Sequence, residues 1–194
     1  MKIQRRKNRY APIVRWLDQR LGAVLAALLF TGEAIGALCG GGMNDGAATI
    51  SGDLMQYCGY SISRMFFAAA GPVTVLFAVM FFAGTALGGT VWIPLAVLFR
   101  GLGIGASLGM CFRGGSFREI ADGIFLLLPY CAGTSGLLLA QGKESIRMAT
   151  DLNRMVIDRG YSPDFMRFVV RSICIFAGLC ACALLYAAAV CMRY

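Results

Sequence analysis

The sequence predicts an all-α integral membrane protein, a bundle of five transmembrane helices without a soluble domain. Of its 194 residues, 58% are hydrophobic and only 14% are charged, which leaves too little polar surface to coat a soluble globule of this size. A helix needs roughly 20 apolar residues to cross about 30 Å of hydrocarbon, and five runs are long enough. These runs are residues 21–39, 65–83, 91–112, 120–140 and 168–191. They are apolar all round and lack the alternation of a membrane β-barrel.

The distribution of Lys and Arg predicts the orientation of the bundle. Seven of the 18 lie in the first 20 residues and six lie between Lys143 and Arg171. Cytoplasmic loops accumulate these residues, so we expect a cytoplasmic N-terminus and an external C-terminus. The net charge of +8 then reflects topology and attraction to anionic membrane lipid. No module that reads nucleic acid is visible in the sequence.

Two cytoplasmic segments have amphipathic patterns. Residues 1–20 are predicted to form a basic interfacial segment that leads into the first span. Residues 142–167 are predicted to form a connection whose apolar residues share one helical face: Ile146, Ala149, Leu152 and Val156. This face either is part of a solvated connecting helix or docks a cytoplasmic protein. Ser162 and Pro163 predict the start of the last span, as the helix cap and the first helical residue.

Glycine recurs at every fourth position of the first and third spans, which predicts two helix-packing ridges. Lipid competes for apolar side chains, so membrane helices associate through small residues that let their backbones approach. The two ridges consist of Gly32, Gly36 and Gly40 and of Gly101, Gly105 and Gly109. The G-x-G-x-x-G spacing of a dinucleotide site is absent from this stretch.

Arg100 lies inside the third span, where an unpaired charge costs roughly 2.5 to 3.5 kcal/mol. Glu33 of the first span is the predicted partner in an intramembrane ion pair. Both spans run outward, and the two residues differ in depth by roughly 7 to 8 Å, which long side chains can bridge. Such a pair would either fix the register of the glycine ridges or form a polar site in a conduction path.

Patterns for catalysis, cofactor binding and metal binding are missing. The chain has no histidine, which removes the usual general base and the H-E-x-x-H zinc site. Its eight cysteines form no C-x-x-C pair. We therefore expect no enzyme activity, no cofactor and no metal site. Four cysteines gather near the predicted outer surface, where a disulfide could form: Cys39, Cys58, Cys111 and Cys191.

Three stretches resemble the stage II sporulation protein M family. In "GTALGGTVWIPLAVLFRGLGIGASLGM" (84–110), a Gly-rich turn, a proline, an apolar run and a basic residue precede G-x-x-x-G, as in that family. "TGEAIGAL" (31–38) is similar to its small-residue pattern, and "GIFLLLPYCAGTSGLLLA" (123–140) stands where the family has a leucine-rich run that reaches Leu-Pro. Many relatives carry a His and then an acidic residue after this proline, whereas Tyr130 and Thr134 occupy the region here.

The resemblance implies a membrane scaffold in endospore formation, which recruits peptidoglycan-degrading partners to the septal membrane for engulfment. Residues 40–64 form the longest predicted extracytoplasmic loop, which either contacts these partners or is a solvated linker. Its apolar and aromatic anchors are Leu54, Met55, Tyr57 and Tyr60. The alternative function is a small permease subunit that couples to a cytoplasmic ATPase through residues 143–159. The sequence is compatible with a homo-oligomer.

Overall fold

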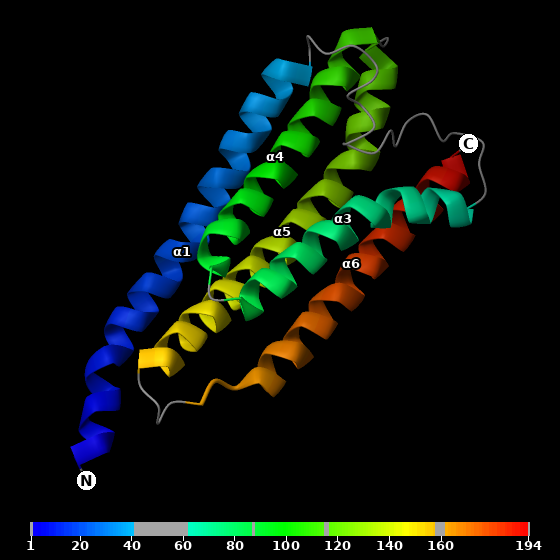
Figure 1. Cartoon of the computed structure of the whole chain (residues 1–194). Helices are drawn as coiled ribbons and strands as arrows, with labels where there is room; N and C mark the ends of the chain where they lie inside the picture. Colours follow the sequence, from blue (N-terminus) through cyan, green and yellow to red (C-terminus); the bar gives the residue numbers. More distant parts are fainter. Residues whose placement is uncertain (1, 41–61, 87, 115–116, 158–161, 194) are drawn as a thin grey trace.

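The structure, a computed structural model, is all-helical. It describes residues 2–40, 62–86, 88–114, 117–157 and 162–193. Within these ranges lie five helices: α1 (Lys2–Gly40), α3 (Ile62–Thr85), α4 (Gly89–Gly114), α5 (Phe117–Ile157) and α6 (Phe165–Arg193). Figure 1 shows them as one bundle with the two chain termini at opposite ends. The all-α prediction is confirmed for these residues.

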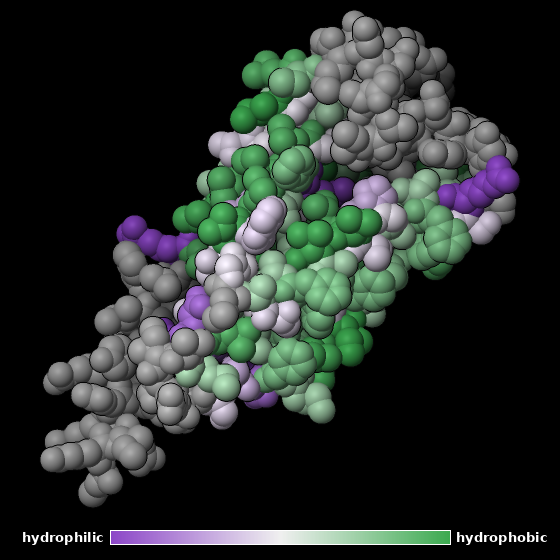
Figure 2. All heavy atoms as spheres, in the orientation of Figure 1, coloured by the Kyte–Doolittle hydropathy of each residue, from purple (hydrophilic) through white to green (hydrophobic). Residues whose placement is uncertain are grey.

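Four helices are long and apolar enough to cross a membrane, and they coincide with four of the five predicted spans. They comprise Arg20–Cys39, Ile62–Thr85, Gly89–Gly109 and Phe165–Met192. Their outward faces carry large exposed apolar side chains, among them Phe30, Phe67 and Leu185. Figure 2 shows that apolar side chains dominate the visible face of the described helices. Because water would disfavour so much exposed apolar surface, these helices suggest a membrane protein.

The fifth predicted span, residues 120–140, lies in α5, a helix of 41 residues. Pro129 is accommodated within this helix. At 1.5 Å per residue α5 is about 60 Å long, roughly twice the thickness of the hydrocarbon core. The side chains of residues 117–123 and 126 lie outside the described part, but Leu127 and Leu138 are buried. One face of the run from 127 onward therefore packs inside the bundle, whereas Leu128 is exposed.

The first part of the predicted amphipathic connection over 142–167 belongs to the same helix as residues 120–140. Residues 142–157 continue α5 without a break, and the apolar residues Ile146 and Ala149 are buried in the bundle. Gly142 permits this packing, because a Cβ there would lie 3.3 Å from Ile93 Cγ2 and 3.5 Å from Leu25 Cδ1. The helix continues because its apolar face is covered by α1 and α4 instead of by lipid headgroups.

The predicted interfacial segment 1–20 is also a continuation of its span. α1 is a single helix of 39 residues, and Figure 1 shows its first turns extending past the ends of the other helices. The side chains of residues 2–19 lie outside the described part. A continuous helix satisfies its backbone hydrogen bonds internally, whereas a break at the membrane surface would leave them to other partners.

Two short features complete the bundle at the end that holds the N-terminus. α3 ends at Thr85 and α4 begins at Gly89. Gly84, at the end of α3, packs so closely on α5 that a Cβ would lie 2.9 Å from Ser145 Cβ. α6 is capped by Asp164, whose Oδ1 accepts a hydrogen bond of 3.2 Å from the Arg167 backbone amide. The predicted cap at Ser162 is therefore displaced by two residues, because the helix begins at Phe165.

Candidate functional site

The predicted glycine ridges are confirmed for four of their six members. α1 packs on α4 through Gly32 and Gly36 on one side and Gly101 and Gly105 on the other. A Cβ on Gly32 would lie 2.6 Å from the Leu98 carbonyl oxygen and 3.1 Å from Gly101 Cα. The two backbones are thus in direct contact, which only glycine allows.

The contact between α1 and α4 is less fully described at the other two ridge glycines. Gly109 is half-buried, and the surroundings of Gly40 lie outside the described part. The α1–α4 glycine contact is therefore defined over about one helical turn, from the level of Gly32 and Gly101 to the level of Gly36 and Gly105. Both helices run in the same direction there, because residue numbers rise together along the contact.

Arg100 does not form the predicted ion pair with Glu33. Its guanidinium Nη2 instead donates a hydrogen bond of 2.7 Å to Thr134 Oγ1 on α5, and its Cζ lies 6.0 Å from the centroid of the Tyr130 ring. Glu33 acts on this charge only through space; no ion pair joins the two among the described residues. The reason is that α5 packs beside α4 and offers both an acceptor and an aromatic face.

Arg100, Tyr130 and Thr134, which we call the Arg100 cluster, connect four helices. The Thr134 hydroxyl accepts from Arg100 and donates to the Tyr130 carbonyl at 2.8 Å. The Tyr130 hydroxyl donates to the Ala69 carbonyl on α3 at 2.7 Å. Tyr130 also packs on Tyr186 of α6, with ring centroids 4.7 Å apart. Both hydroxyls are committed to backbone carbonyls, so neither is available as a proton donor for chemistry.

A cavity of about 50 Å³ adjoins this cluster between α3, α4 and α5. Its walls are mostly apolar, and its polar members are Arg100, Tyr130 and Ser107. Ser107 donates to the Gly103 carbonyl at 3.0 Å. Arg100 Nε is buried without a hydrogen-bond partner in the described part of the chain. The cavity is therefore a small, partly open space with one cation in its wall.

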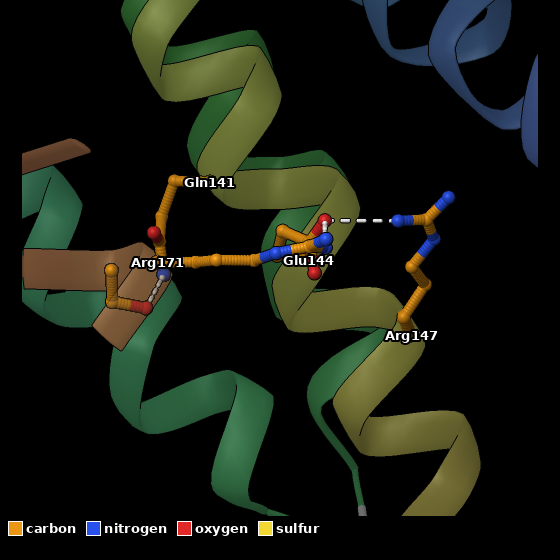
Figure 3. A network of polar contacts seen from close by, with 5 residues as sticks. Gln141, Glu144, Arg147 and Arg171 are labelled. Atoms are coloured by element: carbon orange, nitrogen blue, oxygen red, sulfur yellow. Dashed lines mark hydrogen bonds and ion pairs between the residues drawn. The ribbon is translucent and has the colours of Figure 1, made fainter. Parts of the chain in front are cut away.

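A second polar network lies nearer the N-terminal end of the bundle (Figure 3). Gln141 Nε2 donates to Ser145 Oγ at 3.2 Å and to Ser172 Oγ on α6 at 3.1 Å. All three side chains are fully or almost fully buried, and Gln141 Oε1 has no partner among the described residues. These bonds attach α6 to α5 at a level where both helices are covered by others.

One turn further along α5, Glu144 holds two arginines. Its Oε1 accepts from Arg147 at 2.9 Å and from Arg171 of α6 at 2.5 Å, as Figure 3 shows. Both arginine side chains are about 40% exposed (40% and 41%). The trio carries a net positive charge at the edge of the bundle, where water and lipid headgroups screen it.

Gln141, Glu144 and Ser172 were not predicted as site residues, and Thr134 was not predicted as the partner of Arg100. One signal was present: Tyr130 and Thr134, like Gln141 and Ser145, are four residues apart and so lie on one side of α5. A polar residue repeated at this spacing inside an apolar run indicates an interior face. The helix that faces it could not be inferred from spacing.

Other predicted residues lie outside the described part. These are the loop anchors Leu54, Met55, Tyr57 and Tyr60, together with Cys58. Cys39 and Cys191 are free thiols, and the Cys111 side chain is not among the described ones. Within the described ranges, no group of three or more His, Cys, Asp or Glu side chains could hold a metal ion.

No family model, no curated protein and no solved structure matches the chain. The resemblance to the sporulation family therefore rests on the three sequence stretches that carry it.

Proposed function

We propose that this protein is a membrane scaffold in endospore formation, which anchors peptidoglycan-degrading partners at the septal membrane. The resemblance of residues 31–38, 84–110 and 123–140 to the stage II sporulation protein M family supports this role. The proposal includes five membrane spans, with the N-terminus in the cytoplasm and the C-terminus outside. The excess of Lys and Arg in residues 1–20 and 143–171 supports that orientation.

The backbone contact between α1 and α4 is the observation that carries the proposal. α1 ends at Gly40 and α3 begins at Ile62, so the predicted outer loop starts and finishes on this bundle. Gly32 and Gly105 pack α1 against the backbone of α4, and Tyr130 attaches α3 to α5 through the Ala69 carbonyl. A loop whose two ends are fixed in this way loses less conformational entropy when it binds a partner. This suits a loop that anchors other proteins.

The alternative, a permease subunit, needs an open docking surface for an ATPase on residues 143–159. Ile146 and Ala149, which belong to the apolar face of this segment, are buried against the chain's own helices. The part of the face that these two residues form offers an ATPase little apolar area, whereas Leu152 is half-buried and Met155 is exposed. This burial favours the scaffold over the permease.

Co-purification from gently solubilised membranes tests the proposal. Two variants are compared with the wild type: replacement of 40–64 by a neutral linker of equal length, and simultaneous Ser substitution of the four loop anchors. A matched control carries Asn44→Ala and Thr49→Ala, which alter polar residues of the same loop. Each variant is first checked for equal abundance in the membrane.

We expect cell-wall hydrolases to co-purify with the wild type and the control and to be lost from both loop variants. Hydrolases that still bind the linker variant would contradict the assignment of the loop. An ATPase that co-purifies in place of hydrolases, and survives the loop replacement, would replace the scaffold by the permease.

A further inference from the structure

We propose that the cavity between α3, α4 and α5 binds a small free anion of halide size, held by the Arg100 guanidinium. This inference is independent of the scaffold role, because it rests on the interior of the bundle and not on the outer loop. Three observations carry it: the donors left unused on Arg100, the depth of this residue, and the space beside it.

Arg100 has many more hydrogen-bond donors than acceptors around it. A guanidinium carries five N–H groups, and one of them, on Nη2, donates to Thr134 Oγ1. Nε is buried without a partner. The Tyr130 ring lies with its centroid 6.0 Å from Arg100 Cζ, a contact that is weaker than an ion pair. The unused donors therefore call for an acceptor that the protein does not supply.

The depth of Arg100 makes this shortage expensive. The candidate span of α4 covers Gly89–Gly109, so Arg100 stands about 16 Å along the helix from its start. This position is near the middle of the hydrocarbon layer, where bulk water is not available to complete the hydrogen bonds. A charge at this depth is stabilised when it pairs with an opposite charge.

The space beside the guanidinium fits a small anion. The cavity measures about 50 Å³, and since one water needs roughly 10 to 15 Å³ in such a measure, it holds a halide with a water or two. Gly103, three residues from Arg100 on the same face of α4, lines this space, and a Cβ on Gly103 would meet no atom within 4 Å. A lipid phosphate is disfavoured by the depth of the site and its size.

The test uses the full chain in nanodiscs of neutral phosphatidylcholine, at constant ionic strength, with chloride replacing gluconate. Binding to the folded state alone should raise the Tm with the logarithm of the chloride concentration above Kd, by about 3 to 6 °C at a tenfold excess over Kd. Radiolabelled chloride in equilibrium dialysis should reach one ion per chain, a measurement that needs no variant.

Three variants separate the site from general stability. Arg100→Gln removes the cation and Gly103→Leu fills the cavity while keeping the cation; both should abolish the chloride effect. Glu33→Gln removes a negative charge that acts on Arg100 through space, so it should strengthen chloride binding. If Arg100→Gln fails to fold, the chloride dependence of Gly103→Leu and Glu33→Gln still tests the proposed anion site.

An equal Tm in chloride and gluconate, with no chloride retained by the wild type, would overturn the proposal. A second outcome also overturns it: native mass spectrometry could find one anionic lipid per chain, bound in cell membranes and lost from Arg100→Gln. The cation would then serve a lipid headgroup and not a free anion. Chloride binding that persists in both Arg100→Gln and Gly103→Leu would place the ion elsewhere and equally refute the assignment.

Discussion

Gly105→Ala should destabilise the bundle, because the contact between α1 and α4 has no space for the added methyl group. Gly105 is buried, and a Cβ on it would overlap the Glu33 carbonyl oxygen and lie 2.8 Å from the Ala37 backbone nitrogen. Both neighbours are backbone atoms of α1, so neither can rotate away as a side chain could. α1 and α4 must move apart to admit the methyl group.

The size of the effect follows from this separation. Overpacking of a tight contact typically costs about 1 to 3 kcal/mol, and a gap of 0.5 to 1 Å forfeits a quarter to a half of each dispersion contact along the interface. Replacing Gly by Ala also favours the helix by up to about 1 kcal/mol. Gly136→Ala is the matched control: it makes the same change on α5, where a Cβ would meet nothing within 4 Å.

Thermal unfolding of the two variants in the same detergent isolates the clash, since the helix-propensity gain is common to both. For a chain of 194 residues, 1 kcal/mol corresponds to about 2 to 4 °C, so Gly105→Ala should melt about 2 to 12 °C below Gly136→Ala. Two Tm values within about 1 °C of each other would refute backbone contact as the basis of α1–α4 packing.

Three further outcomes are expected. Thr134→Val should lower the free energy of chemical unfolding by about 1.5 to 3 kcal/mol, because it removes the hydroxyl that accepts from the charged Arg100 guanidinium. Thr134→Ser keeps the hydroxyl and should lose much less stability. An equal loss in the two variants would show that the Thr134 methyl group, and not its hydroxyl, stabilises the bundle. Glu144→Gln should destabilise by at most about 1 kcal/mol, since the Arg147 and Arg171 side chains are half-exposed; the difference in Tm should shrink in 1 M salt, and a salt-independent difference would contradict an electrostatic origin. Reporter fusions should show a fluorescent protein active at the N-terminus and a periplasmic phosphatase active at the C-terminus; the reverse pattern, or one reporter type active at both ends, would contradict five spans in the proposed orientation.

Much of the helical framework was predictable from the sequence. Residues 21–39 and 65–83 coincide closely with the spans Arg20–Cys39 and Ile62–Thr85, because length and hydropathy alone decide which runs can cross a bilayer. The lengths of α1 and α5 were not predictable. Whether a helix continues past the membrane depends on what covers the faces of residues such as Ile146, and that cover comes from other helices.

The sequence by itself determined that the first and third spans meet. On each of the two helices glycine recurs at every fourth position, and the helices run in the same direction: Gly32 and Gly36 on α1, Gly101 and Gly105 on α4. Two backbones can approach closely only where side chains are absent. Such local periodicity is a property of one helix and can be read without its neighbours.

Only the tertiary structure decided the partner of Arg100. The sequence offered Glu33 as the one opposite charge at a similar depth, yet the guanidinium bonds to Thr134 and faces Tyr130. Both residues lie on α5, and the side of α4 on which α5 packs is set by the whole bundle. Charge alone does not select a contact, because a long side chain takes the acceptor that packing brings within reach.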